Sequence, residues 1–157
     1  MSNHRRLQIL IAAHAALMGS TSAGAGCFIG NLKRITEDVS INVMHGRDEP
    51  REGADANATT MDSDAEIFID LSVRGRSDAA DGSTVPRWLQ ALSDLAAEVH
   101  RELLAAPDLG LPWLFDLEPD GTEAPRTDGD GERIRVTLRT RWRAIYRHAY
   151  DDPSTGV

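Results

Sequence analysis

The sequence has one cysteine and no long apolar run, and each shortage excludes a class of protein. Cys27 has no second cysteine with which to pair, so the disulfide-stapled secreted class is excluded and a reducing compartment fits best. The longest apolar stretch, residues 7–18, is interrupted by polar side chains and is too short to span a bilayer. We therefore expect no membrane partner. Arg5 and Arg6 ahead of this stretch also resemble the start of a secretory signal, which is the alternative interpretation of the N-terminus.

Positive charge and aromatic rings are also scarce. The 17 Lys and Arg residues face 25 Asp and Glu residues, and a net charge of −8 argues against a protein that neutralises many phosphates. Three Trp, two Tyr and three Phe, with 41% hydrophobic residues overall, are enough for one core but leave few rings for base stacking. The length of 157 residues predicts a single domain over 1–157.

Hydrophobic periodicity predicts an α+β fold with a mainly antiparallel sheet of about four strands, packed by two α-helices. The predicted elements follow the order α-β-β-α-β-β: helix 3–18, strands 39–44 and 66–74, helix 86–106, and strands 113–117 and 133–147. We expect Ser2 or Asn3 to cap the first helix. Long loops separate the elements, and we expect a flexible loop over 48–63 and a short C-terminal tail over 151–157.

The patterns that usually mark catalysis or metal binding are incomplete. There is no Gly-x-Ser-x-Gly elbow, Cys27 has no histidine close in sequence, and the glycines of 24–30 have the wrong spacing for a dinucleotide or phosphate loop. Residues 116–127 begin like a calcium loop, but Thr127 occupies the position that needs a bidentate Glu. The histidines are scattered: His4, His14, His45, His100 and His148. We therefore expect no catalytic residue, metal or cofactor, and no enzyme activity, although a metal site assembled only in three dimensions stays open.

A row of arginines on one face of the last predicted strand is the sharpest feature of the sequence. Its members are Arg133, Arg135, Arg139, Arg141, Arg143 and Arg147. Such a row can pair with carboxylates or with phosphates. We favour pairing between protein surfaces, within or between subunits, and predict an interface formed by Arg135, Arg139, Arg141, Arg143, Glu66 and Asp70. Contact with DNA and a merely solvated face are the alternatives.

The layout of the chain resembles the tail terminator, or tail completion, proteins of long-tailed bacteriophages, of the minor tail protein U type. The features that carry the resemblance are the amphipathic first helix, the strand exit at His45-Gly46-Arg47, the strand 66–73, the helix 88–104, the segment Asp120-Gly121-Thr122-Glu123, and a last strand that runs into Tyr146 and Tyr150. The resemblance covers most of the chain. The connection 19–30 is richer in small residues than the pattern, and the loop 48–63 is longer.

The resemblance implies a structural virion subunit with no covalent chemistry. Six copies would form a ring at the head-proximal end of the tail tube, end tube polymerisation and present a docking surface to the head-closure or connector protein. The expected partners are other copies of the chain, the major tail tube protein and the connector. DNA would only pass through the lumen, and assembly would occur in the host cytoplasm. We expect Arg47, Asp48 and Glu49 to contact the tube or connector. Another neck component is the first alternative, and a DNA-contacting module is the second.

Overall fold

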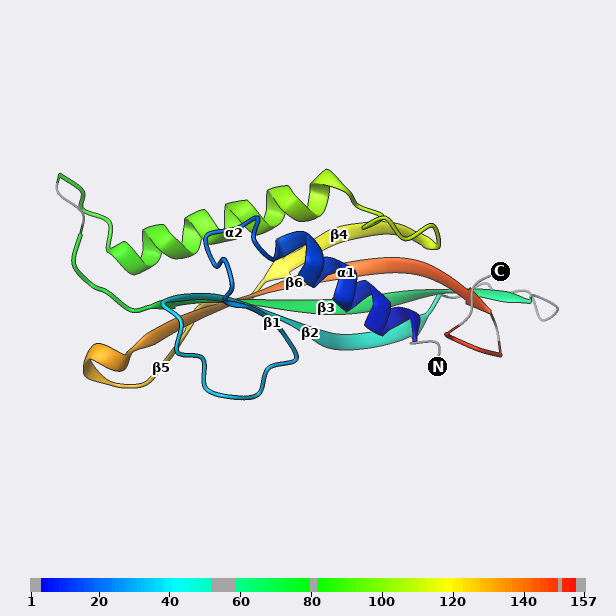
Figure 1. Ribbon diagram of the computed structural model, residues 1–157, viewed down its shortest axis with the longest axis horizontal. Helices are drawn as coiled ribbons and strands as arrows, with labels where there is room; N and C mark the ends of the chain where they lie inside the picture. Colours follow the sequence, from blue (N-terminus) through cyan, green and yellow to red (C-terminus); the bar gives the residue numbers. More distant parts are fainter. Residues whose placement is uncertain (1–3, 52–58, 80–81, 150, 155–157) are drawn as a thin grey trace.

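In the computed structural model, whose described residues are 4–51, 59–79, 82–149 and 151–154, two helices cover one face of a six-stranded sheet (Figure 1). In chain order the elements are α1 (Arg5–Leu17), β1 (Cys27–Ile29), β2 (Val39–Pro50), β3 (Thr60–Arg74), α2 (Arg87–Ala105), β4 (Leu114–Thr122), β5 (Arg126–Asp128), the 3-10 helix η1 (Gly131–Arg133) and β6 (Arg135–Ala149). The strand order is β1-β2-β3-β6-β4, and β5 pairs with β6 beside this path.

The predicted fold class is wrong in strand number, order and direction. The order of helices and strands is α-β-β-β-α-β-β-β, and the sheet is mixed because β1 runs parallel to β2 while the other pairs are antiparallel. The prediction missed β1 and β5 because each has three residues, which is too short for alternation to be visible.

The predictions of the two helices are confirmed to within two residues at each end. α1 buries Ile9, Leu10, Ala13 and Leu17 on one stripe, and its N-cap is His4, whose Nδ1 accepts a hydrogen bond from the Arg6 N–H at 3.0 Å. The predicted caps Ser2 and Asn3 lie outside the described residues. α2 follows Pro86 and buries a stripe of four residues: Leu92, Leu95, Val99 and Leu103. No helix in the described ranges is long and apolar enough to cross a membrane.

The core lies between the helices and the sheet. Strand residues of one parity face the helices and are buried; in β3 they are Ala65, Ile67, Ile69, Leu71 and Val73. β6 contributes Val136, Trp142, Ala144 and Tyr146 to the same cluster. Apart from Ala65, which precedes the predicted strand, these are apolar positions that the two-residue period predicts, so the period correctly assigns which face of each strand is buried.

β2 and β3 are both longer than predicted. β2 continues to Pro50 and β3 begins at Thr60, so the two strands extend into the range 48–63 for which we predicted a flexible loop. A register shift between His45 and Asp48 hides the extension, because it interrupts the alternation of side chains. Residues 52–58 of that range lie outside the described residues, as do 155–157 of the predicted tail.

Candidate functional site

The face of the sheet that points away from the helices carries most of the charged strand residues, and we call it the open face. It comprises Ser40, Asn42 and Met44 of β2, the alternate residues Asp62 to Ser72 of β3, the alternate residues Arg135 to Arg147 of β6, and Asp116 and Glu118 of β4. The segment between β1 and β2 closes over one end, where the Asn42 side chain exchanges two hydrogen bonds with the Asn31 backbone. Neither α1 nor α2 packs on the rest of this face.

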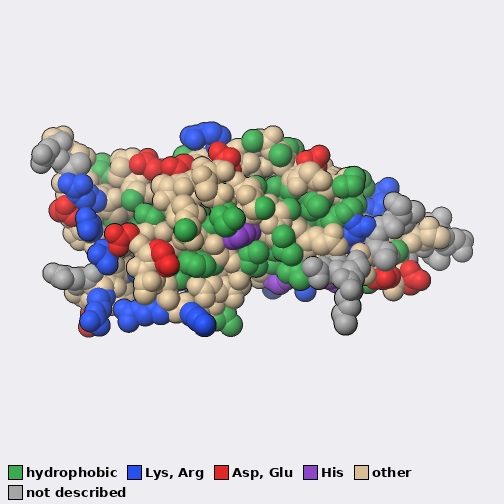
Figure 2. Space-filling model, viewed as in Figure 1, with side chains coloured by type: hydrophobic (Ala, Val, Ile, Leu, Met, Phe, Trp, Pro, Cys, Tyr) green, Lys and Arg blue, Asp and Glu red, His purple; other side chains and the backbone are tan. Residues whose placement is uncertain are grey.

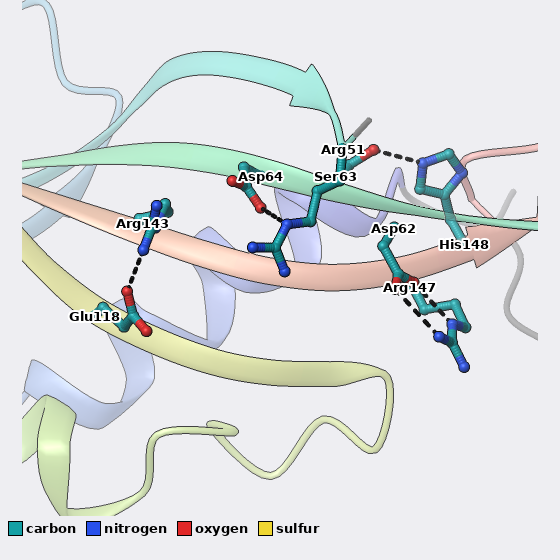
Figure 3. Close-up of polar contacts among 8 residues, drawn as sticks. All are labelled: Arg51, Asp62, Ser63, Asp64, Glu118, Arg143, Arg147 and His148. Carbon is teal, nitrogen blue, oxygen red and sulfur yellow. Dashed lines mark hydrogen bonds and ion pairs between the residues drawn. The ribbon is translucent and has the colours of Figure 1, made fainter. Parts of the chain in front are cut away.

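Unbroken antiparallel register between β3 and β6 brings opposite charges together across the open face. Asp62 lies opposite Arg147, and Asp70 lies opposite Arg139. Both pairs form ion pairs, with Nε–Oδ1 distances of 2.8 Å for Arg147–Asp62 and 2.7 Å for Arg139–Asp70. Figure 3 shows the Arg147–Asp62 pair bridging the two strands. Arg139 and Arg147 of the predicted row therefore pair with carboxylates of their own chain.

Arg133 is the member of the predicted row that lies outside β6. It belongs to η1, and β6 begins two residues later at Arg135. Arg135 donates to the backbone carbonyl of Glu37 and contacts the Ser72 hydroxyl at 3.4 Å. Burial lowers the pKa of Arg135, with nearby acidic side chains opposing the shift.

Arg139 and Asp70 form the best enclosed ion pair of the face. Two hydrogen bonds join them, from Nε to Oδ1 at 2.7 Å and from Nη2 to Oδ2 at 2.9 Å, and their side chains are 20% and 16% exposed. The guanidinium also lies 4.5 Å from the centroid of the Phe68 ring. The hydrogen bonds to Asp70 raise the pKa of Arg139. Two predicted interface residues are thus held together within one subunit.

The two glutamates of the face have different kinds of partner. Glu66 lies opposite Arg143, but its Oε2 accepts a hydrogen bond from the backbone N–H of Arg47 at 3.2 Å. Arg143 instead bonds Glu118 of β4 at 2.5 Å, as Figure 3 shows, and this hydrogen bond lowers the pKa of Glu118. The Glu66 side chain can reach the Arg47 N–H because residue 46 is glycine: a Cβ at that position would lie 2.7 Å from Cγ of Glu66.

Arg141 lies at the centre of the open face and forms no ion pair with an acidic residue of the described ranges. Its register partner is Phe68, and its Nε is buried without a hydrogen-bond partner. A charged donor that has lost water without gaining a partner is costly, so an acceptor supplied from outside would relieve that cost. Arg141 beside the Phe68 ring is therefore the point at which the open face is best prepared for a carboxylate or carbonyl of another molecule.

The structure separates the three residues that we predicted to contact the tube or connector. The register shift in β2 pairs Asp48 with Ala65, on the helix side of the sheet. There the Asp48 carboxylate accepts a 2.9 Å hydrogen bond from the hydroxyl of Tyr146, whose pKa is raised chiefly by burial and further by Asp48. Arg47 and Glu49 are exposed. Only these two can meet a partner without disturbing an internal contact.

Two nucleophile-like groups are enclosed rather than displayed. The Ser63 hydroxyl lies 3.0 Å from Nε2 of His148, but the two residues are only 4% and 7% exposed. Sequence reasoning missed this pair because its members are 85 residues apart and only the β3–β6 register places them on neighbouring strands. Burial raises the pKa of the Cys27 thiol to about 11, which keeps it protonated at neutral pH.

A groove at one end of the open face was also missed, and we call it the basic groove. Its walls are the segment 32–36 and the turn 128–135, and its floor includes Asp70, Ser72 and Thr137. Its cations are Lys33, Arg34, Arg74, Arg133 and Arg135. The sequence contains a signal for this groove, because cations precede β2 and lie at the start of β6. Both strands are antiparallel to β3 and therefore run in the same direction, so these cations meet at one end of the sheet.

No protein-family model matches the chain, and no curated protein matches it. Among solved structures, the chain is similar to a chain of a "Virion of native gene transfer agent (GTA) particle", at 13% identity and a TM-score of 0.48. The similarity covers 91% of this chain and 90% of that chain. A similarity of this size supports no inference about function.

Proposed function

We propose that the protein is a structural virion subunit of the tail terminator type, which acts by assembly and catalyses no reaction. Copies form a ring at the head-proximal end of the tail tube, end tube polymerisation and present a docking surface to the head connector. The family resemblance of the sequence supports the role. The observation that carries assembly is the open face, one whole side of a sheet that is left without a covering layer of helices.

The chemistry of the open face suits a contact between protein surfaces. Its charges are largely paired within the chain, so a neighbour can cover them without leaving many isolated ions in the interface. At its centre Arg141 has an unsatisfied donor and lies opposite Phe68, and arginine is one of the residue types that most often dominate binding energy. Other atoms of the face, Nε of Arg143 among them, are also buried without a hydrogen-bond partner, but Arg143 has an ion pair with Glu118, whereas Arg141 has none among the described residues.

Electron microscopy of a lysate tests the role directly. The gene is disabled while the other structural genes stay intact, and the particles are compared with those of the undisturbed lysate. The proposal predicts overlong tails that fail to join filled heads. Tails of normal length on heads would refute it, and free tails of normal length beside leaking heads would assign the protein to the head side of the neck.

Variants of the purified protein test whether the open face forms the contact between subunits. Arg141→Glu places an acid beside the acidic residues of the open face, so we expect ring formation to weaken while the melting temperature stays close to that of the wild type. Arg101→Glu is the matched control, because Arg101 is exposed on α2, away from the open face. Equal ring formation by both variants, measured by mass photometry and negative-stain microscopy, would remove Arg141 from the interface.

A further inference from the structure

The basic groove is a concave site that the chain builds but does not fill. It encloses about 890 Å³ between the segment 32–36 and the turn 128–135. Figure 2 shows Lys and Arg side chains gathered along the lower left edge of the molecule, where Figure 1 places the β1–β2 segment and the turn before β6. The groove is continuous with the open face, because its floor consists of open-face residues of β2, β3 and β6.

The charges of the groove are unbalanced. Five cations line it against two carboxylates, Asp70 and Asp128. One of these cations, Arg74, already forms an ion pair with Asp38 at 3.2 Å, which leaves four. Asp70 is already occupied by Arg139, and Asp128 accepts a hydrogen bond from the Gly129 N–H. Lys33 and Arg34 are exposed, and neither side chain forms an ion pair with a residue that the structure describes. The groove therefore has a local excess of positive charge on a chain whose net charge is −8.

The lining favours a protein ligand over a nucleic acid. None of its residues is aromatic, so it provides no platform on which a base could stack. Leu32 stands at the rim with 90% of its surface exposed, and Ile35 and Ile134 add apolar surface to the walls. An exposed leucine beside cations matches a peptide that carries both apolar and acidic side chains.

The same chain carries such a peptide on its opposite sheet edge. Residues 115–120 of β4 contain three carboxylates and no cation, and we call them the acidic segment. Glu118 is paired with Arg143, so the two carboxylates without an ion pair among the described residues are Asp116 and Asp120. Phe115 at its start is 49% exposed, with the Arg147 guanidinium 4.9 Å from its ring centroid. Asp120 is exposed and lies within a register shift between β4 and β6. β4 ends the strand order of the described sheet, so its outer edge is unpaired.

We propose that the basic groove of one copy receives the acidic segment of a neighbouring copy. The inference rests on the proposed function, and it identifies the contact that joins subunits in the ring. Groove and segment are two different surfaces of one chain, so the contact is heterologous and repeats from copy to copy until a ring closes. Charge complementarity fixes the order of the copies, and Leu32 and Phe115 supply the apolar part of the contact.

Charge exchange between two variants tests the contact. The groove variant is Lys33→Glu with Arg34→Glu, and the segment variant is Asp116→Lys with Asp120→Lys. Each protein alone brings like charges together at every contact, so we expect its apparent dissociation constant for assembly to rise about tenfold or more. An equimolar mixture restores opposite charges at every contact when the two proteins alternate, so we expect rings to return. Arg101→Glu is the matched control.

Sedimentation velocity at low and moderate salt gives the assembled fraction, and thermal melting checks that each variant is folded. Rings of wild type and mixture, with loss of rings in each variant alone, support the contact. If each variant alone forms rings as well as the wild type does, the proposed contact is wrong, and the proposed function is unaffected. A wild type that never assembles, at any concentration or with tube protein present, would instead refute the proposed function.

Nucleic acid is the competing ligand for the basic groove, and the groove variant distinguishes nucleic-acid binding from subunit binding. The wild type is titrated with duplex DNA at low salt, where phosphate contacts are strongest. We expect no binding that depends on Lys33 and Arg34. Salt-dependent binding that the groove variant loses, with unchanged ring formation, would assign the groove to DNA and overturn the proposal.

Discussion

The enclosed ion pair on the open face provides a quantitative test of how the sheet is stabilised. Replacing Asp70 and Arg139 by alanine, singly and together, isolates their coupling energy in a double-mutant cycle. The pair has two hydrogen bonds and side chains that are 20% and 16% exposed. Exposed pairs contribute about 0.2–1 kcal/mol, and removing one partner of a fully buried pair costs about 3–5 kcal/mol. A half-buried bidentate pair lies between, so we expect a coupling of about 1.5 kcal/mol.

Urea unfolding measures the four free energies, and a second ion pair provides the control. Arg87 and Asp78 approach to 2.6 Å, but their side chains are 49% and 62% exposed. Solvent screening should limit their coupling to about 0.5 kcal/mol or less. Equal coupling energies in the two cycles would refute the argument that enclosure and bidentate geometry strengthen the Arg139–Asp70 pair.

Three further predictions concern other parts of the chain. Gly46→Ala should destabilise the fold by about 1–2 kcal/mol, because its Cβ would lie 2.7 Å from Glu66 Cγ. Glu66→Ala should recover part of the loss, because it removes Cγ and Oε2 but keeps the Cβ at 2.9 Å, and no recovery in urea unfolding would contradict the clash. Cys27 is buried and its pKa is raised to about 11, so it should react slowly with a thiol reagent until the chain is unfolded; rapid native labelling would contradict this burial. Desolvation and then Arg6 lower the pKa of His4 below 6.5. The unfolded chain therefore binds the extra proton, and stability should fall as the pH drops below about 6.5. His4→Asn keeps a capping side chain, so its melting temperature should fall less on acidification; an equal fall would contradict this role.

The helices and the last strand were predictable because their patterns are long. α2 repeats its apolar stripe over 19 residues, and β6 alternates over 15. Their burial follows from the period alone, since neither contains an interruption. The arginine row was predictable for the same reason, and so was its pairing with Asp70, because alternation places both on the same face of the sheet.

Interruptions account for most of what could not be predicted. The alternation of β4 predicts Trp113, Phe115 and Leu117 on one face, but a register shift between Leu114 and Asp116 turns Leu114 and Leu117 inward and leaves Phe115 exposed. A comparable shift in β2 turns Asp48 toward the helices. One extra residue in a strand reverses which side chains of the following residues face the core, and no local sequence pattern predicts where it occurs.

Partner choice within the open face also needs the structure. The sequence places Glu66 on the correct face, but only strand order shows that Glu118 of β4 lies on the other side of β6 and takes Arg143. The basic groove depends on strand order too, because its two walls are about a hundred residues apart along the chain and meet only through β3. Sequence patterns identify faces, whereas sites that join several strands depend on topology.

The central claim is that the open face is covered when subunits assemble, and hydrogen–deuterium exchange tests it most directly. Amide exchange is compared between dilute subunits and purified rings, peptide by peptide. We expect added protection at the outer edge of β4 and in the segment 32–36, together with reduced accessibility of Arg141 to an arginine-modifying reagent. The result that would contradict the claim is that assembly changes neither rate. In that case the two segments exchange, and Arg141 reacts, as fast in rings as in the free subunit.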